Sequence, residues 1–236
     1  MKNSFRVAKL FNIDIRLHLT FFILPVLVSL VYYHQYGFGV GLRAFCLVIF
    51  VFLCVLGHEL CHSLMAKRYG IAVPEITLYL IGGVASMHRI PRQPKKEFMI
   101  SIVGPLFNFL LALLSYWPLY FLIGNEKLHN PSLDSWSGTL ANLFWINSVL
   151  GLFNLIPAFP MDGGRIFRSV LAFRLDYLQA TRISVYLGRV FAIIFFLLGI
   201  RKRHVMLIFI AFFVYASASD EFRSIKRNYE LNKESH

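Results

Sequence analysis

The segment Gly57-His58-Glu59-Leu60-Cys61-His62 contains the pattern HExxH. Residues four apart lie on one face of a helix, so His58 and His62 can direct two imidazoles at one ion. Glu59 lies one position further round the helix and can reach a water molecule on that ion. Two histidine ligands with a general base beside them are typical of zinc hydrolases, although five residues alone also match by chance. The setting is unusual because the surrounding helix is apolar enough to cross a membrane.

The composition is that of a membrane protein. Of 236 residues, 57% are hydrophobic and 15% are charged, and the mean hydropathy is +0.62. Soluble domains of this size seldom have such values. We therefore expect an all-α polytopic membrane protein of one domain. The net charge of +12 is better explained by basic residues that flank spans than by nucleic-acid binding.

Apolar runs with at most one charged residue each predict about six transmembrane helices, which together form one domain over residues 1–219. The first four runs have about 20 residues or more, as a spanning helix needs, and the last two are shorter. In the stretch Val73–Met87, Gly82 and Gly83 separate two runs of β-type residues. This pattern predicts a short β segment at the cytoplasmic membrane surface. We expect residues 220–236 to be a charged tail that frays. The predicted spans are approximately 17–36, 44–66, 98–124, 138–157, 183–200 and 204–219.

The distribution of basic residues predicts the orientation. Segments 1–16, 67–97, 158–182 and 220–236 carry 18 Lys and Arg residues, and the opposite side carries five. The positive-inside rule then places both termini and the active-site opening in the cytoplasm of a multi-pass protein of the cell membrane. The cluster Arg201-Lys202-Arg203 is an exception on the far side. His58 and His62 would lie on the order of 7–13 Å below the cytoplasmic boundary.

A catalytic zinc ion needs a third protein ligand. Of the twelve Asp and Glu residues, ten lie in cytoplasmic, interfacial or far-side segments, and Glu59 is the candidate base. Asp162 remains, after an apolar stretch broken by proline. An Asp followed by Gly163-Gly164 is also ordinary chemistry for a helix cap, so both interpretations stay open.

Two further alternatives concern the same helix. Cys54 and Cys61 lie at helical spacing from the histidines, so a thiolate could be a ligand, but cysteine is common in apolar helices as a small hydrophobe. The pair His58 and His62 could also be a structural, hydrogen-bonded pair. The three cysteines of the chain all lie in this helix and predict no disulfide framework.

A second motif, Asn154-Leu155-Ile156-Pro157-Ala158-Phe159-Pro160-Met161-Asp162-Gly163, together with HExxH in a spanning helix resembles the site-2 protease family. These are intramembrane zinc metalloproteases. Ile81-Gly82-Gly83-Val84 and Gly104-Pro105-Leu106-Phe107-Asn108 are also similar to family features. The resemblance covers nearly the whole chain and is closest to compact archaeal and bacterial members with six spans. The PDZ or CBS regions of many relatives are not visible in this sequence.

The resemblance implies one zinc ion per chain, held by His58, His62 and Asp162, with Glu59 as the catalytic base. It also makes Asn154 a candidate for positioning the substrate backbone or oxyanion, although Asn154 could instead bond between helices. The expected activity is regulated intramembrane proteolysis, the hydrolysis of a peptide bond in or near a substrate's transmembrane segment. The expected partners are a membrane-protein substrate and the lipid bilayer, and no nucleic acid.

Three rival classes fit the sequence less well. A non-catalytic sensor with structural zinc would not need Glu59 beside the first histidine. A di-iron membrane enzyme needs several histidine boxes, but only one pair among the eight histidines is clustered. A transporter would show internal repeats with matched broken helices, which this sequence lacks.

Overall fold

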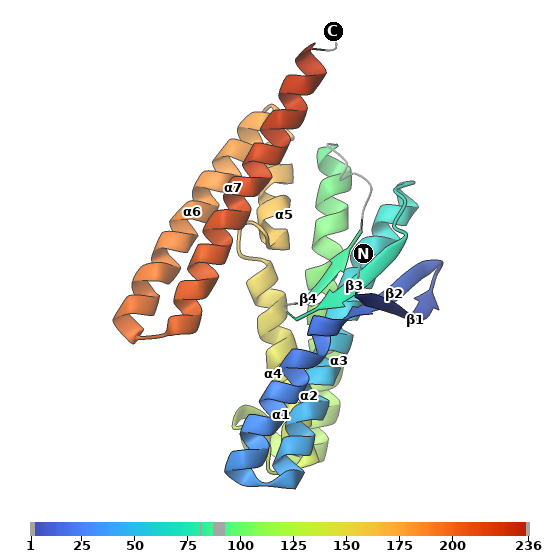
Figure 1. The fold of residues 1–236 in the computed structure, drawn as a ribbon, viewed down its shortest axis with the longest axis vertical. Helices are drawn as coiled ribbons and strands as arrows, with labels where there is room; N and C mark the ends of the chain where they lie inside the picture. The colour runs from blue at the N-terminus through green and yellow to red at the C-terminus, as the bar shows by residue number, and fades with distance from the viewer. Residues whose placement is uncertain (1–2, 81, 87–92, 235–236) are drawn as a thin grey trace. The chain divides into compact units, whose positions relative to one another are not determined.

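The structure is a computed structural model that describes residues 3–80, 82–86 and 93–234. The elements follow in the order β1 (Ser4–Leu10), β2 (Ile13–His18), a short 3-10 helix (Leu19–Phe22), α1 (Ile23–Tyr36), α2 (Phe38–Arg68), β3 (Glu75–Tyr79), β4 (Gly82–Ala85), α3 (Pro94–His129), α4 (Trp136–Asn154), α5 (Asp162–Leu171), α6 (Tyr177–Lys202) and α7 (Val205–Glu234) (Figure 1). The chain divides into two compact units. The first comprises Met1–Arg89 and Val103–Gly151, and the second comprises Ile90–Ile102 and Leu152–His236.

Five helical segments of the described residues are long and apolar enough to cross a membrane. They are Leu19–Tyr36, Phe38–Arg68, Pro94–His129, Tyr177–Lys202 and Val205–Arg227, which correspond to five of the six predicted spans. The remaining predicted span falls on α4, a helix of 19 residues without charge. Asn142 and Asn147 lower the hydropathy of α4, so the predicted span at 138–157 stays a prediction.

Two glycines with positive φ mark the ends of predicted spans. Gly37 has φ 85° between α1 and α2, where the sequence predicts a turn. Gly124, with φ 79° and ψ 163°, interrupts α3 where the predicted third span ends. Only glycine adopts these values without strain, so the two positions fix where the helices break.

The description all-α is wrong in one respect, because the described part of the chain contains a four-stranded sheet with the order β1-β2-β3-β4. The predicted β segment at Val73–Met87 is confirmed as the antiparallel pair β3 and β4, although Ile81 and Met87 lie outside the described residues. The basic N-terminal segment forms a second antiparallel pair, β1 and β2, through a turn at Phe11 and Asn12 with positive φ. β2 then joins β3 in parallel.

The sheet rests on the helix that carries HExxH. Ile13, Ile15 and Ile76 are buried together, and Leu56 and Leu60 of α2 pack against them. Leu56 and Leu60 are four apart and therefore lie on one face of α2, on either side of the motif's first residues. Burial of these side chains holds the sheet against the helical turn that contains His58 and Glu59.

Arg168 of α5 is the charged centre of the second unit. Its side chain is fully buried, and its Nε and Nη2 donate to Glu97 Oε1 of α3 at 2.9 and 2.5 Å, while Nη1 donates to Glu221 Oε1 of α7 at 2.6 Å. The rings of Phe159 and Tyr177 lie 4.9 and 5.1 Å from the guanidinium carbon. Burial disfavours the charge, but Glu97, Tyr177 and Glu221 raise the pKa of Arg168 above its ordinary value. A buried charge needs such partners, and they fix α5 within this unit.

The C-terminal segment differs from the prediction. α7 continues through the predicted tail as far as Glu234, so residues 220–234 are helical. Exposed ion pairs at helical spacing, Asp220 with Arg223 and Lys226 with Glu230, favour a helix there. Lys95 and Lys96, which precede the predicted third span, belong to α3.

Candidate metal centre

The two motif histidines converge inside the first unit. His58 and His62 are only 4% and 5% exposed, and their Nε2 atoms lie 3.0 Å apart. The ring centroids are 4.7 Å apart in an edge-to-face arrangement. The sequence prediction that one helix face directs both imidazoles at a common point is confirmed.

This nitrogen pair fits a zinc ion. Two nitrogens bound to a tetrahedral zinc at about 2.0–2.1 Å would be separated by about 3.3 Å. The observed separation of 3.0 Å between the Nε2 atoms is close to that value, so small movements would suffice for both to ligate one ion.

Gly104 of α3 provides the space in front of these nitrogens. A Cβ added at Gly104 would lie 2.7 Å from His58 Nε2 and still closer to His62 Nε2 and Cε1. Directly before His58 on the motif helix, a Cβ at Gly57 would lie 2.5 Å from the ring of Phe107. The two glycines therefore let α2 and α3 approach closely at the level of the histidines.

Two asparagines form a hydrogen-bonded series that begins at Nδ1 of His58. His58 Nδ1 lies 2.5 Å from Asn108 Oδ1, and Asn108 Nδ2 donates to Asn147 Oδ1 at 2.7 Å. Asn147 Nδ2 in turn donates to the backbone oxygen of Asn108 at 2.9 Å. A Cβ at Gly151, one turn after Asn147, would lie 3.1 Å from Asn108 Cβ, so α4 packs tightly here. The sequence alone indicates no role for Asn147, because a lone Asn in an apolar helix has no spacing pattern.

Glu59 is half-buried beside strand β4. A Cβ added at Gly83 would lie 2.9 Å from Glu59 Cγ, so the backbone of β4 lies directly against the acidic side chain. The glycine therefore brings an extended backbone next to the candidate general base.

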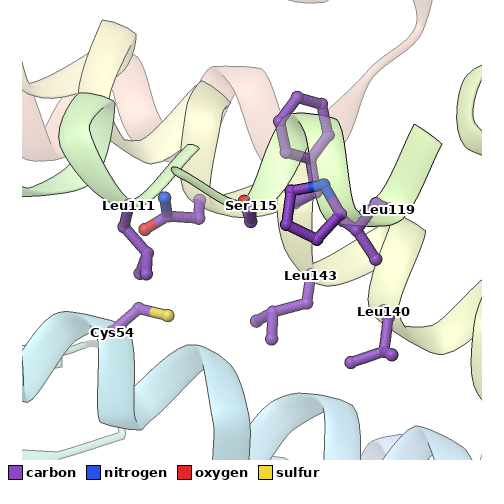
Figure 2. A pocket seen from close by; sticks show the side chains of 9 residues that line it. Cys54, Leu111, Ser115, Leu119, Leu140 and Leu143 are labelled. Carbon is purple, nitrogen blue, oxygen red and sulfur yellow. The ribbon is translucent and has the colours of Figure 1, made fainter. Parts of the chain in front are cut away.

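An apolar cavity of about 210 Å³ lies beside Asn147, between α2, α3 and α4. Figure 2 shows the side chains of Cys54, Leu111, Ser115 and Leu143 around it. Cys54, one turn before His58, thus faces apolar surroundings, in agreement with its interpretation as a small hydrophobe. The lining residues are Cys54, Leu111, Ser115, Pro118, Leu119, Leu140, Leu143, Phe144 and Asn147.

The remaining predicted site residues belong to the second unit. Asn154 is the last residue of α4, and Asp162 is the first residue of α5. The N-cap of α5 is Met161, so the interpretation of Asp162 as the N-cap is wrong, although an acidic residue in the first turn is favourable for the helix dipole. A Cβ at Gly163 would collide with the backbone oxygens of Leu155 and Ile156, which shows how sharply the chain turns before α5.

Comparison with known proteins identifies the family. A model of peptidase family M50 matches residues 45–197, which include His58, Glu59, His62 and Asp162. The chain belongs to peptidase family M50. The resemblance to site-2 proteases is confirmed by a solved structure, the site-2 protease from Methanocaldococcus jannaschii. It is 37% identical with a TM-score of 0.63, and the match covers 93% of this chain and 95% of that chain.

Two further relatives of this M50 chain are also named zinc metalloproteases. A zinc metalloprotease of Methanocaldococcus jannaschii is 37% identical over 227 residues, which are 96% of this chain and 62% of that protein. Rip3 of Mycobacterium tuberculosis is 32% identical over 178 residues, which are 71% of this chain and 43% of that protein. The match thus spans less than two thirds of the length of these two curated relatives.

Replacing Gly104 with alanine should empty the metal centre. Alanine favours helix more than glycine does, so α3 should form, but the new Cβ occupies the space in front of His58 and His62. Metal analysis of the purified Gly104→Ala protein should show a large loss of zinc. The matched control is Gly188→Ala, whose Cβ would meet ordinary contacts at 3.5 Å. Full zinc content in Gly104→Ala would contradict this description of the centre.

Proposed function

We propose that this chain is an intramembrane zinc metalloprotease that hydrolyses a peptide bond in or near a transmembrane segment of a membrane-protein substrate. The observation that carries the proposal is the convergence of two buried imidazole nitrogens, 3.0 Å apart, next to an acidic side chain on an apolar helix. Buried polar groups at such positions indicate function, because they are costly in a membrane. Membership of a peptidase family supports hydrolysis over a structural zinc site.

In this proposal His58, His62 and Asp162 hold one zinc ion per chain. Asp162 is supported by elimination among the carboxylates and by its position at the first residue of α5, directly after the proline-containing segment. A bound zinc ion would polarise the scissile carbonyl and lower the pKa of a water molecule. Three protein ligands leave the fourth position open for that chemistry.

Glu59 is the proposed general base. It takes a proton from the attacking water and later donates it to the leaving amine. Glu59 follows His58 directly in the helix, and Gly83 of β4 lies against its side chain. A substrate held along β4 would therefore present its backbone beside this carboxylate.

β4 is the proposed docking strand for an unwound substrate. Within the described residues it pairs only with β3, in a register that places Val84 opposite Thr77. Ser86 N donates to Glu75 O at 2.9 Å, so alternation along an antiparallel pair directs the backbone groups of Gly83 and Ala85 away from β3. These groups could bond an added strand, as in other cases of peptide recognition at a sheet edge.

The finer topology is part of the same proposal. Six spans, with α4 as the fourth, would place both termini and the active-site opening at the cytoplasmic side of the cell membrane, as the basic residues predict. Asn154 at the end of α4 is proposed to hold the substrate backbone. The substrates are proposed to be membrane proteins that undergo regulated intramembrane proteolysis.

Replacement of Glu59 by glutamine should abolish turnover while zinc still binds. Loss of a general base lowers a rate by about 10²–10⁴-fold, since the amide cannot accept the proton of water. The measurement is cleavage of a membrane-protein substrate by purified protein, paired with metal analysis. Glu126→Gln, at an exposed position of α3, is the control. Retained turnover by Glu59→Gln would exclude Glu59 as the base.

Asp162→Ala should lower the zinc content sharply. The control is Asp176→Ala, because Asp176 also begins a helix of the second unit and its Oδ2 accepts from Leu178 N at 3.0 Å. Loss of that cap should cost about 1 kcal/mol of stability without loss of zinc. Equal zinc contents in the two variants would show that Asp162 does not bind zinc and only stabilises the first turn of α5.

Ala85→Pro tests the docking strand. Proline removes the backbone N–H that points away from β3, and edge strands tolerate proline. Loss of one hydrogen bond to substrate, at about 0.5–1.5 kcal/mol, should raise KM up to about tenfold with unchanged zinc. Val84→Pro removes a bond of the β3–β4 pair instead and should lower the melting temperature. Wild-type kinetics in Ala85→Pro would argue against strand addition at β4.

A further inference from the structure

The two nitrogens of His58 have different partners. Nδ1 lies 2.5 Å from Asn108 Oδ1, an oxygen that can only accept, so Nδ1 carries the proton. In a neutral imidazole Nε2 then has the lone pair, and Nε2 is the atom that converges with His62. The tautomer that can bind metal through Nε2 therefore depends on which end of the Asn108 amide faces the ring.

Asn147 determines that orientation. The Asn108 amide could turn over and present its nitrogen to His58, which would favour the tautomer with the proton on Nε2. Turned over, however, Asn108 Oδ1 would face Asn147 Oδ1, and two acceptors would be in contact. Asn147 cannot turn over to relieve this, because its Nδ2 donates to the backbone oxygen of Asn108, which can only accept.

The orientation of each side chain thus depends on the one before it, from the backbone carbonyl of Asn108 to the imidazole of His58. The carbonyl of Asn108 orients Asn147, Asn147 orients the Asn108 side chain, and that side chain selects the tautomer of His58. Asn108, Asn147 and His58 are 0%, 3% and 4% exposed, so water has little access to replace a missing partner. These hydrogen bonds join three helices, α2, α3 and α4.

We propose that Asn147 is a positioning residue that selects the tautomer of His58 with the lone pair on Nε2, the nitrogen that converges with His62, although two hydrogen bonds separate Asn147 from His58. The proposal rests on the proposed function in one respect, that His58 binds zinc. It gives α4 a direct part in the metal centre without supplying a ligand. Hydrogen-bond partners of ligating histidines fix the ring and tautomer, and their loss weakens metal binding by about 10–100-fold.

Three variants separate positioning from packing. Asn147→Leu removes both hydrogen bonds with a side chain of similar size, and the apolar cavity that Asn147 lines can accommodate it. Asn147→Asp, kept neutral by burial, has a carbonyl oxygen to accept from Asn108 and a hydroxyl to donate back. Asn142→Leu is the matched control on the same helix, because Asn142 Nδ2 donates to Gly138 O within its own helix.

The experiment has two readouts on full-length protein in detergent. Imidazole ¹⁵N chemical shifts of zinc-free protein report the tautomer of His58, and competition with a chelator reports zinc affinity. We expect wild type, Asn147→Asp and Asn142→Leu to have the proton on Nδ1 and similar affinities. Asn147→Leu should show protonation of Nε2 and a zinc affinity about 10–100-fold weaker.

The contrary results are distinct. Asn147→Leu with the wild-type tautomer and affinity, even with an altered melting temperature, would overturn the positioning role and leave Asn147 a packing residue. Wild-type protein that binds no zinc would instead refute the proposed function. The ¹⁵N shifts of the zinc-free protein would still test the positioning role in that case.

Discussion

The main constraint on this fold is the burial of two imidazoles, beside a half-buried carboxylate, in a helix that is apolar enough to cross a membrane. Buried polar groups without partners are costly, so the surroundings of the HExxH helix must supply them. The structure meets this demand through side chains that α3 and α4 contribute. His58 has Asn108, Asn108 has Asn147, and Asn147 has a backbone carbonyl. His58, Asn108 and Asn147 therefore form a hydrogen-bonded series of buried polar groups within apolar helices.

Small residues are the second requirement of the same site. Gly57 and Gly104 let α2 and α3 approach, Gly151 lets α4 approach Asn108, and Gly83 lets β4 approach Glu59. Close approach through small residues is how helices associate where no hydrophobic driving force separates them from lipid. Here the approach also determines what reaches the metal-binding face, since a single methyl group at Gly104 would occupy it.

The sequence predicted the motif helix, five spans and the β3–β4 pair because each depends on local signals: a four-residue spacing, uncharged runs and glycine pairs. The β1–β2 pair was missed because the basic residues of β1 and β2 resemble a membrane flank, and the pairing of β2 with β3 joins residues about 60 apart. The helical end of α7 was missed because charge alone indicates solvent exposure without excluding a helix. Asn147 could not be predicted, since its importance depends on a partner 39 residues earlier in the chain. The third metal ligand was left between two interpretations, of which the structure excludes the N-cap.

X-ray absorption at the zinc edge of the purified, zinc-loaded protein is the most direct test of the metal centre. We predict two imidazole nitrogens at about 2.0–2.1 Å and a carboxylate oxygen at about 2.0–2.2 Å, with no sulfur in the ligand shell. A sulfur ligand at about 2.3 Å would show that Cys54 or Cys61 binds the ion, and would contradict the ligand set His58, His62 and Asp162.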